Sequence, residues 1–229
     1  MWADPDSKPL ILSPNAVHIW WFRGDQAPVL ELLDTSERSA MGRLRSEADR
    51  LRFASRRTNL RRVLAAYGAG QPAELRIERW CERCGDPHHG RPRLLSPATL
   101  SFSTTSRPGA ALIAVSTCSM RVGVDLERAD LSAAADLFDC ALGSLEHAGV
   151  DPSDPRGVVR LWCRKEALLK ADGVGLAVVA LTEIDVRNEL VQGWHLADLS
   201  LHGDWVGAIA TRSRAAPTIV IDGDVALHS

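Results

Sequence analysis

The chain has 229 residues, of which 45% are hydrophobic and 24% charged, and its formal net charge at pH 7 is −2. This composition fits one large or two small globular domains, and no apolar run is long enough for a transmembrane helix. The first residues lack a signal-peptide pattern, and the five scattered cysteines do not suggest a disulfide framework. We therefore expect a cytoplasmic protein that does not bind a membrane.

The first half of the chain predicts both strands and helices. In chain order these are a strand over 17–22, a helix over 28–44, a helix over 46–67, a strand over 74–80, a turn-rich loop over 81–97 and a buried strand over 109–116. Pro28 suits the first turn of a helix, and Gly68 is suited to end the second helix. The strands are recognised by their apolar and β-branched residues.

The second half is expected to begin with a strand over 121–128 that forms a hairpin with the strand over 109–116. The remaining predicted elements are two short helices around Gly143, a helix over 158–170 and strands over 182–188, 194–201, 205–212 and 216–222. Runs of strands with helices beside them favour an α+β fold over a doubly wound parallel sheet.

Positive charge is concentrated in one segment. Between Arg38 and Arg62 the chain has nine arginines and two carboxylates. Such a stretch predicts a site for a polyanion, and nucleic acid and a phosphorylated cofactor are both candidates. The alternative is a solvated arginine-rich face of a helix.

A pair of carboxylates lies on the strand predicted over 121–128. Alternation along a strand puts Asp125 and Glu127 on one face, together with Gly123. Their spacing of about 6.6 Å lets both carboxylates reach one point, and hard oxygen ligands suit Mg²⁺. We expect Gly123 to let a ligand approach the backbone. The alternative is a half-exposed strand with an acidic outer face.

The helix over 158–170 carries charge inside its apolar side. On a helical wheel Lys165 falls within the apolar arc, and Glu166 lies at its edge, one turn before Lys170. A simple i,i+4 ion pair accounts for Glu166 and Lys170 but leaves Lys165 unexplained. Because a buried lysine requires an anionic partner, we expect this helix to border carboxylates, phosphates or both.

Two motifs in this chain resemble those of 4′-phosphopantetheinyl transferases of the larger, surfactin-synthetase-activating type. They are VGVDLE at 122–127 and WCRKEALLK at 162–170. The Gly-x-Gly-Leu sequence at 173–176, the Gly-Arg-Pro sequence at 90–92 and the arginine-bearing helix also resemble family features. The similarity spans roughly residues 49–176.

The resemblance implies transfer of 4′-phosphopantetheine from coenzyme A to a serine of an apo acyl or peptidyl carrier protein, with release of 3′,5′-ADP. It implies that Asp125, Glu127 and Glu166 hold Mg²⁺. It also implies that Glu166 and Lys170 are catalytic. Glu166 is the family's candidate base, with a metal-bound water as the alternative, and Lys170 contacts the phosphates and steadies the leaving group.

The resemblance also implies a set of residues that contact coenzyme A. They are Arg50, Arg57, Arg91, Ser103, Thr104, Lys165 and Lys170. The chain departs from the family where Asn-hydrophobic-Ser-His is usual, because Thr104 stands in place of the histidine. A threonine hydroxyl donates a hydrogen bond but carries no positive charge, so we expect weaker coenzyme A binding or compensation by Arg107.

The family fold has two similar α/β halves related by a pseudo-twofold axis, with the cofactor in the cleft between them. Applied to this chain, it implies an N-terminal half over 1–118 and a C-terminal half over 119–229. A monomer that does not bind nucleic acid is expected. Two other functions are weighed: a Mg²⁺-dependent nucleotide hydrolase and an arginine-rich nucleic-acid-binding regulator.

Cys81 and Cys84, followed by His88 and His89, resemble half of a zinc site. A structural zinc site requires four ligands, and no second cysteine pair follows at the usual spacing. Reduced cysteines in a turn are the alternative to a zinc site.

Overall fold

The computed structural model describes residues 8–24, 26–82, 84–86, 90–96, 99–173 and 180–222. Its α-helices are α1 (Thr35–Gly42), α2 (Glu47–Ala66), α3 (Leu131–Ala141), α4 (Ser144–His147) and α5 (Pro155–Asp172). Its strands are β1 (Ala16–Arg23), β2 (Ile77–Trp80), β3 (Arg91–Leu94), β4 (Leu100–Arg107), β5 (Ala110–Thr117), β6 (Arg121–Arg128), β7 (Leu190–Val191), β8 (Trp194–Leu199), β9 (Trp205–Arg212) and β10 (Thr218–Asp222). Within these ranges no helix has the length and apolar character needed to cross a bilayer.

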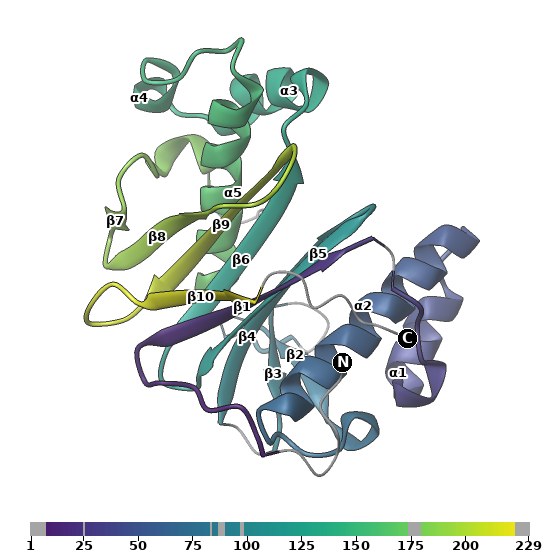
Figure 1. Ribbon diagram of the computed structural model, residues 1–229. Helices are drawn as coiled ribbons and strands as arrows, with labels where there is room; N and C mark the ends of the chain where they lie inside the picture. Colours follow the sequence, from purple (N-terminus) through teal and green to yellow (C-terminus); the bar gives the residue numbers. More distant parts are fainter. Residues whose placement is uncertain are drawn as a thin grey trace.

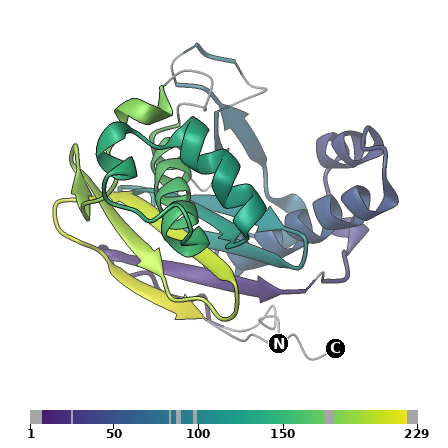
Figure 2. The same cartoon turned by 90° about the horizontal axis from the view of Figure 1, so that it is seen from above.

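The strands form two four-stranded sheets and a small β2–β3 hairpin. The strand orders are β10-β1-β5-β4 and β6-β9-β8-β7. The β1–β10 ladder is parallel, whereas β1–β5, β4–β5 and β6–β9 are antiparallel. Strand β10, at the end of the described chain, thus lies beside β1 in the first sheet (Figures 1 and 2). The mixed arrangement confirms the predicted α+β class, and the pseudo-twofold relation stays a prediction.

Both sheets lie between two groups of helices, α1 and α2 on one side and α3 to α5 on the other (Figure 1). Three buried apolar clusters fill the spaces between the helices and the sheets. One lies between α2 and the first sheet and includes Leu60, Leu64, Phe102 and Ile113. A second joins the two sheets and includes Ile19, Leu112, Val124 and Ile209. A third lies between the second sheet and α5 and includes Leu161, Leu169, Leu196 and Ala208.

Several predicted elements are confirmed, including the strands over 17–22 and 109–116 and the helices over 46–67 and 158–170. The single helix predicted over 28–44 is wrong, because Asp34 interrupts it. Leu30–Leu32 form a 3₁₀ turn, and Asp34 then takes an extended conformation and begins α1 with a capping box that involves Glu37.

Other predictions about the strands need correction. Strands β3 and β4 were not predicted, because β4 consists largely of Ser and Thr and lacks an apolar alternation. The hairpin between 109–116 and 121–128 does not form, since β1 and β4 already occupy both edges of β5, and β6 pairs with β9. The strand predicted over 182–188 is absent: a 3₁₀ turn occupies Leu181–Glu183, and the Val186 N–H donates to Glu146 Oε1.

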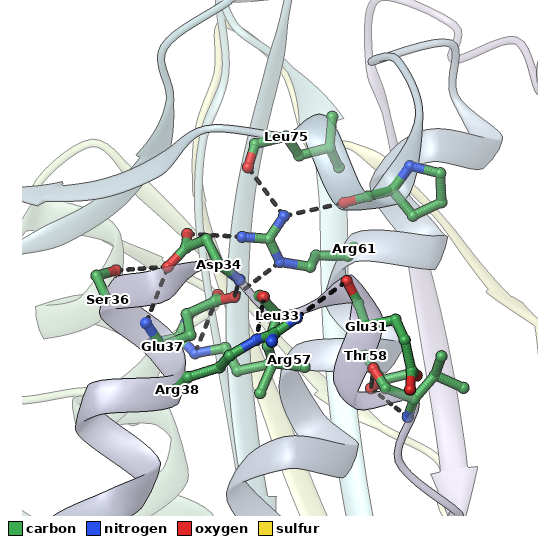
Figure 3. Close-up of polar contacts among 12 residues, drawn as sticks. Glu31, Leu33, Asp34, Ser36, Glu37, Arg38, Arg57, Thr58, Arg61 and Leu75 are labelled. Atoms are coloured by element: carbon green, nitrogen blue, oxygen red, sulfur yellow. Dashed lines mark hydrogen bonds and ion pairs between the residues drawn. The ribbon is translucent and has the colours of Figure 1, made fainter.

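Arg61 is fully buried and holds α1 against α2 (Figure 3). Its guanidinium donates to Asp34 Oδ2 at 2.7 Å and to Glu37 Oε2 at 2.8 Å. It also donates to the carbonyl oxygens of Pro72 and Leu75, both at 2.9 Å. One arginine of the basic segment therefore stabilises the fold and is not available to a ligand.

Replacing Arg61 with methionine is expected to lower the free energy of unfolding by about 3–5 kcal/mol, because Glu37 would keep a buried charge without its main partner. Arg93 forms an exposed pair with Glu78, so Arg93→Met should cost no more than ~1 kcal/mol. Urea unfolding at pH 7 measures both. A loss for Arg61→Met no larger than that for Arg93→Met would contradict this account.

Candidate active site

Helix α5 packs directly on β6, the first strand of the second sheet (Figure 1). A Cβ added to Gly123 would lie 2.0 Å from the Ala167 carbonyl oxygen and 2.5 Å from the Ala171 backbone nitrogen. The absence of a side chain at Gly123 therefore admits the backbone of α5. This corrects the expectation that Gly123 opens the strand to a ligand.

Asp125 is completely buried beneath α5. Its Oδ1 accepts hydrogen bonds from Thr105 Oγ1 at 3.0 Å and from Lys170 Nζ at 2.6 Å. Its Oδ2 has no hydrogen-bond partner among the described residues. The half-exposed acidic strand that we considered is thus not what forms, and the buried carboxylate keeps one oxygen without a partner.

Glu127, two residues along β6, is held by an arginine from β4. Arg107 Nε donates to Glu127 Oε2 at 2.7 Å, and Arg107 Nη2 contacts Oε1 of the same carboxylate. The hydrogen bond to Glu127 is the main cause that raises the pKa of Arg107. Both oxygens of this carboxylate are therefore occupied by one guanidinium.

Glu166 projects from α5 toward the two acids of β6. Burial is the main cause that raises the pKa of Glu166, and the negative charges of Asp125 and Glu127 raise it further, against the opposing effect of Lys170 and Arg107. Its Oε1 is buried without a hydrogen-bond partner among the described residues. We call Asp125, Glu127 and Glu166 the carboxylate cluster.

Cys163, one turn before Glu166, also lies near this cluster. Burial, reinforced by the charges of Asp125 and Glu127, raises the pKa of its thiol well above the usual value. The side chain therefore remains a neutral thiol, and its contacts in the α5 core agree with a packing role.

Lys165 does not join the carboxylate cluster. Its buried ammonium pairs with Glu146 Oε2 at 2.5 Å and donates to the carbonyl oxygens of Ala141 and Leu181 at 2.8 and 2.7 Å. The anionic partner that a buried lysine requires is thus a carboxylate of α4. These contacts join α5 to α4 and to the residues around Ala141 and Leu181. The ammonium of Lys165 is therefore already paired inside the protein and does not lie where the predicted contact with coenzyme A would require it.

The carboxylate cluster fits a hard cation only in part. Asp125 and Glu166 each offer a buried oxygen without a partner, which suits a divalent ion that takes few carboxylates. Glu127 is occupied by Arg107. No group of three or more His, Cys, Asp or Glu side chains in the described part of the chain is arranged to hold a metal ion.

The structure places the predicted coenzyme A arginines in three separate settings. Arg50 donates to the carbonyl oxygens of Leu44 and Arg45, between α1 and α2. Arg57 lies 3.6 Å from Glu37, and burial is the main cause that lowers its pKa. Arg91 donates to Ser101 Oγ at 3.0 Å, and burial, followed by the charge of Arg121, lowers its pKa.

Ser103 and Thr104 lie on opposite faces of β4. Ser103 is buried against β6, where its hydroxyl accepts a hydrogen bond from the Val124 N–H at 3.2 Å. Thr104 shares the α2 face with Phe102. Arg107 lies on the Ser103 face and pairs with Glu127, so it does not stand in for the missing histidine at Thr104 in this structure.

Sequence reasoning missed two residues near the site, Thr105 and Arg56, and gave a third, Arg107, another role. Thr105 contacts Asp125, and Arg107, expected to compensate for Thr104, holds Glu127. Arg56 reaches Ser106 Oγ at 3.5 Å, and burial, followed by the charges of Arg57 and Arg79, lowers the pKa of Arg56 to about 10. The unpredicted strand β4 supplies Thr105 and Arg107, and its alternation of hydroxyl side chains ending in arginine is the signal that could have shown that both lie on one face.

The proposed zinc ligands are only partly described. Cys81 is buried and Cys84 exposed, and all five cysteines lie in described ranges without forming a disulfide. His88 and His89 fall outside the described residues, so the zinc prediction stays a prediction.

Replacing Glu166 with glutamine is expected to stabilise the metal-free protein at neutral pH. The pKa of Glu166 is higher in the folded protein than in the unfolded chain, where it is about 4.3. Protonation of Glu166 therefore stabilises the folded protein, and this stabilisation is fully present below a pH of about 4.3. It is lost as the pH rises through the raised folded pKa. Glu166→Gln should therefore gain about 0.5–2 kcal/mol at pH 7.5, and the gain should shrink toward pH 4.5. Urea unfolding in EDTA across this range measures it; a difference independent of pH would contradict the prediction.

Comparison with known proteins points to one family. Residues 121–215 match the family model of the 4′-phosphopantetheinyl transferase superfamily, and this range includes the whole carboxylate cluster. The chain is also similar to 4′-phosphopantetheinyl transferase HetI of Nostoc sp. (strain PCC 7120 / SAG 25.82 / UTEX 2576), with 28% identity over 223 residues that cover 90% of this chain and 92% of that protein. These matches agree with the resemblance in the sequence motifs: residues 121–215 are similar to the domain of the 4′-phosphopantetheinyl transferase superfamily, and most of the chain is similar to one such transferase.

Proposed function

We propose that this protein transfers 4′-phosphopantetheine from coenzyme A to a serine of an apo acyl or peptidyl carrier protein and releases 3′,5′-ADP. The observation that carries the proposal is the buried pair of unpartnered carboxylate oxygens, on Asp125 and Glu166, beside the ammonium of Lys170. This combination suits a cation and a diphosphate together. It lies within the range that matches the superfamily.

Asp125 and Glu166 are the residues best suited to hold Mg²⁺, and Glu127 would complete the set once Arg107 leaves it. Bound Mg²⁺ would supply charge neutralisation at the diphosphate. The raised pKa of Glu166 supports this assignment, because three carboxylates packed together are stabilised by an added positive charge.

Glu166 is also the proposed general base. Burial, the main cause that raises its pKa, favours proton acceptance, whereas Mg²⁺ on the same carboxylate would oppose it, so a metal-bound water is the competing base. Glu166 would take the proton of the carrier serine as the serine oxygen forms a bond to the phosphorus that carries pantetheine. The bond from that phosphorus to the bridging oxygen then breaks, and the electron pair leaves with 3′,5′-ADP. Lys170 would stabilise the charge that develops on this leaving group.

Partly buried arginines are the proposed contacts for the remaining phosphates of coenzyme A. Arg57 and Arg91 have lowered pKa values because burial disfavours their charge, and a phosphate would compensate that charge. Arg50 lies at the start of the same helix as Arg57. Thr104 remains the proposed replacement of the family histidine and adds a hydroxyl donor on the α2 side of β4.

Further proposals concern the assembly and the partner. We assign the protein to the larger, surfactin-synthetase-activating type, with halves over 1–118 and 119–229 related by a pseudo-twofold axis and coenzyme A bound between them. Carrier proteins of polyketide and nonribosomal peptide synthases are the proposed partners. We also propose a cytoplasmic monomer that acts on neither nucleic acid nor membranes.

Intact mass spectrometry of an apo carrier protein tests the transfer. Incubation with this protein, coenzyme A and Mg²⁺ should add the mass of one phosphopantetheine, and EDTA should abolish the addition. Glu166→Gln should slow transfer by at least ~100-fold, because it removes a base and a metal ligand. The exposed Glu183→Gln is the matched control and should keep the wild-type rate.

Three results would contradict the proposal. Absence of any mass addition across several carriers, together with absence of coenzyme A binding, would exclude the transferase. Nucleotide breakdown without a carrier would favour the hydrolase. Tight nucleic-acid binding that falls steeply with salt and tolerates Glu166→Gln would favour the regulator.

A further inference from the structure

Arg107 is the last residue of β4 and lies between the carboxylate cluster and a cavity. On one side its guanidinium grips both oxygens of Glu127. On the other side it lines a cavity between α2 and the first sheet, together with Arg52, Arg56, Asn59 and Ser106. The two side chains of the ion pair are only partly buried, at 38% and 22% exposed. The contact can therefore break without unpacking the core.

The ion pair with Arg107 matters for cation binding because it distinguishes Glu127 from Asp125 and Glu166. Asp125 and Glu166 each keep a buried oxygen without a partner among the described residues. In Glu127, by contrast, both oxygens already accept a hydrogen bond from Arg107. A divalent cation and a guanidinium on one carboxylate would repel each other, so binding of one disfavours the other.

The cavity on the other side of Arg107 carries positive charge. Among the described residues no carboxylate forms an ion pair with Arg56, which contacts the Ser106 hydroxyl at 3.5 Å and lies over the Phe53 ring. The charges of Arg57 and Arg79 add to the burial that lowers the pKa of Arg56. An anion at the mouth of this cavity would relieve that repulsion. Arg107 lines the same cavity, so a guanidinium released from Glu127 would remain beside it.

We propose that Arg107 is an internal counter-cation of Glu127 that exchanges with the metal ion. In the metal-free protein it neutralises Glu127; when a divalent cation binds the carboxylate cluster, Arg107 leaves and binds a phosphate of coenzyme A. This inference rests on the proposed function and adds a residue that binds Glu127 and coenzyme A in turn. Because the released guanidinium binds the second ligand, metal and coenzyme A bind cooperatively.

Titration with Mn²⁺ alone tests the exchange, with electron paramagnetic resonance reporting the free ion. Arg107→Ala should bind Mn²⁺ about two- to fivefold more tightly than the wild type, because the ion no longer displaces a partly exposed ion pair. Arg56→Ala removes the same charge from the same cavity without touching Glu127, so its Mn²⁺ affinity should stay near the wild-type value. Arg107→Lys, which keeps the charge without the bidentate fork, should fall between the two.

A second titration distinguishes the exchange of Arg107 for the metal ion from the simple loss of a positive charge near the carboxylate cluster. With saturating Mn²⁺, Arg107→Ala should bind coenzyme A about fivefold more weakly, because the released guanidinium is missing. Tighter metal binding with weaker coenzyme A binding supports the exchange. Unchanged or weaker Mn²⁺ binding in both Arg107 variants would overturn it, even if the wild type transfers phosphopantetheine. Failure of the proposed function is recognised separately, as an absence of transfer by the wild type.

Discussion

The backbone contact between α5 and β6 at Gly123 is the constraint on which the site depends. No side chain separates the two elements there, since a Cβ would meet the Ala167 carbonyl oxygen at 2.0 Å. This close approach places Glu166 and Lys170 over Asp125 and excludes water from a charged strand. The same packing that completes the apolar core of the second sheet therefore also brings three carboxylates close together, and the charges of Asp125 and Glu127 add to the burial that raises the pKa of Glu166.

Internal cations balance this repulsion in different ways. Lys170 holds Asp125 at 2.6 Å, and Arg107 holds Glu127, so neither acid is a buried charge without a counter-ion. Glu166 has no such dedicated partner and carries the raised pKa. Lys165, beside it in sequence, stabilises the fold, because its ion pair with Glu146 joins α5 to α4. Stability and function thus use adjacent residues of one helix for different purposes.

Much of this arrangement could be predicted from the sequence, because it follows from local periodicity. Alternation identified the strand that bears Asp125 and Glu127, and helical spacing identified α5 with Glu166 on its edge. The partners could not be predicted, since they come from segments far along the chain. Glu146 as the partner of Lys165 and Arg107 as the partner of Glu127 depend on how the layers pack. Strand β4 is rich in hydroxyl side chains and has too little apolar pattern to be recognised as a strand. The positions of Thr105 and Arg107 beside the carboxylates therefore could not be predicted.

The rate of phosphopantetheine transfer by Gly123→Ala, measured with saturating coenzyme A and Mg²⁺, tests the central claim most directly. The added methyl group must push α5 away from β6, and a displacement of about 1 Å at a reacting centre costs roughly 100-fold in rate. We predict a loss of that size in protein that is still folded by circular dichroism. The control Gly42→Ala, whose added Cβ meets nothing within 4 Å, should retain the wild-type rate. Wild-type transfer and wild-type stability in Gly123→Ala would contradict the account.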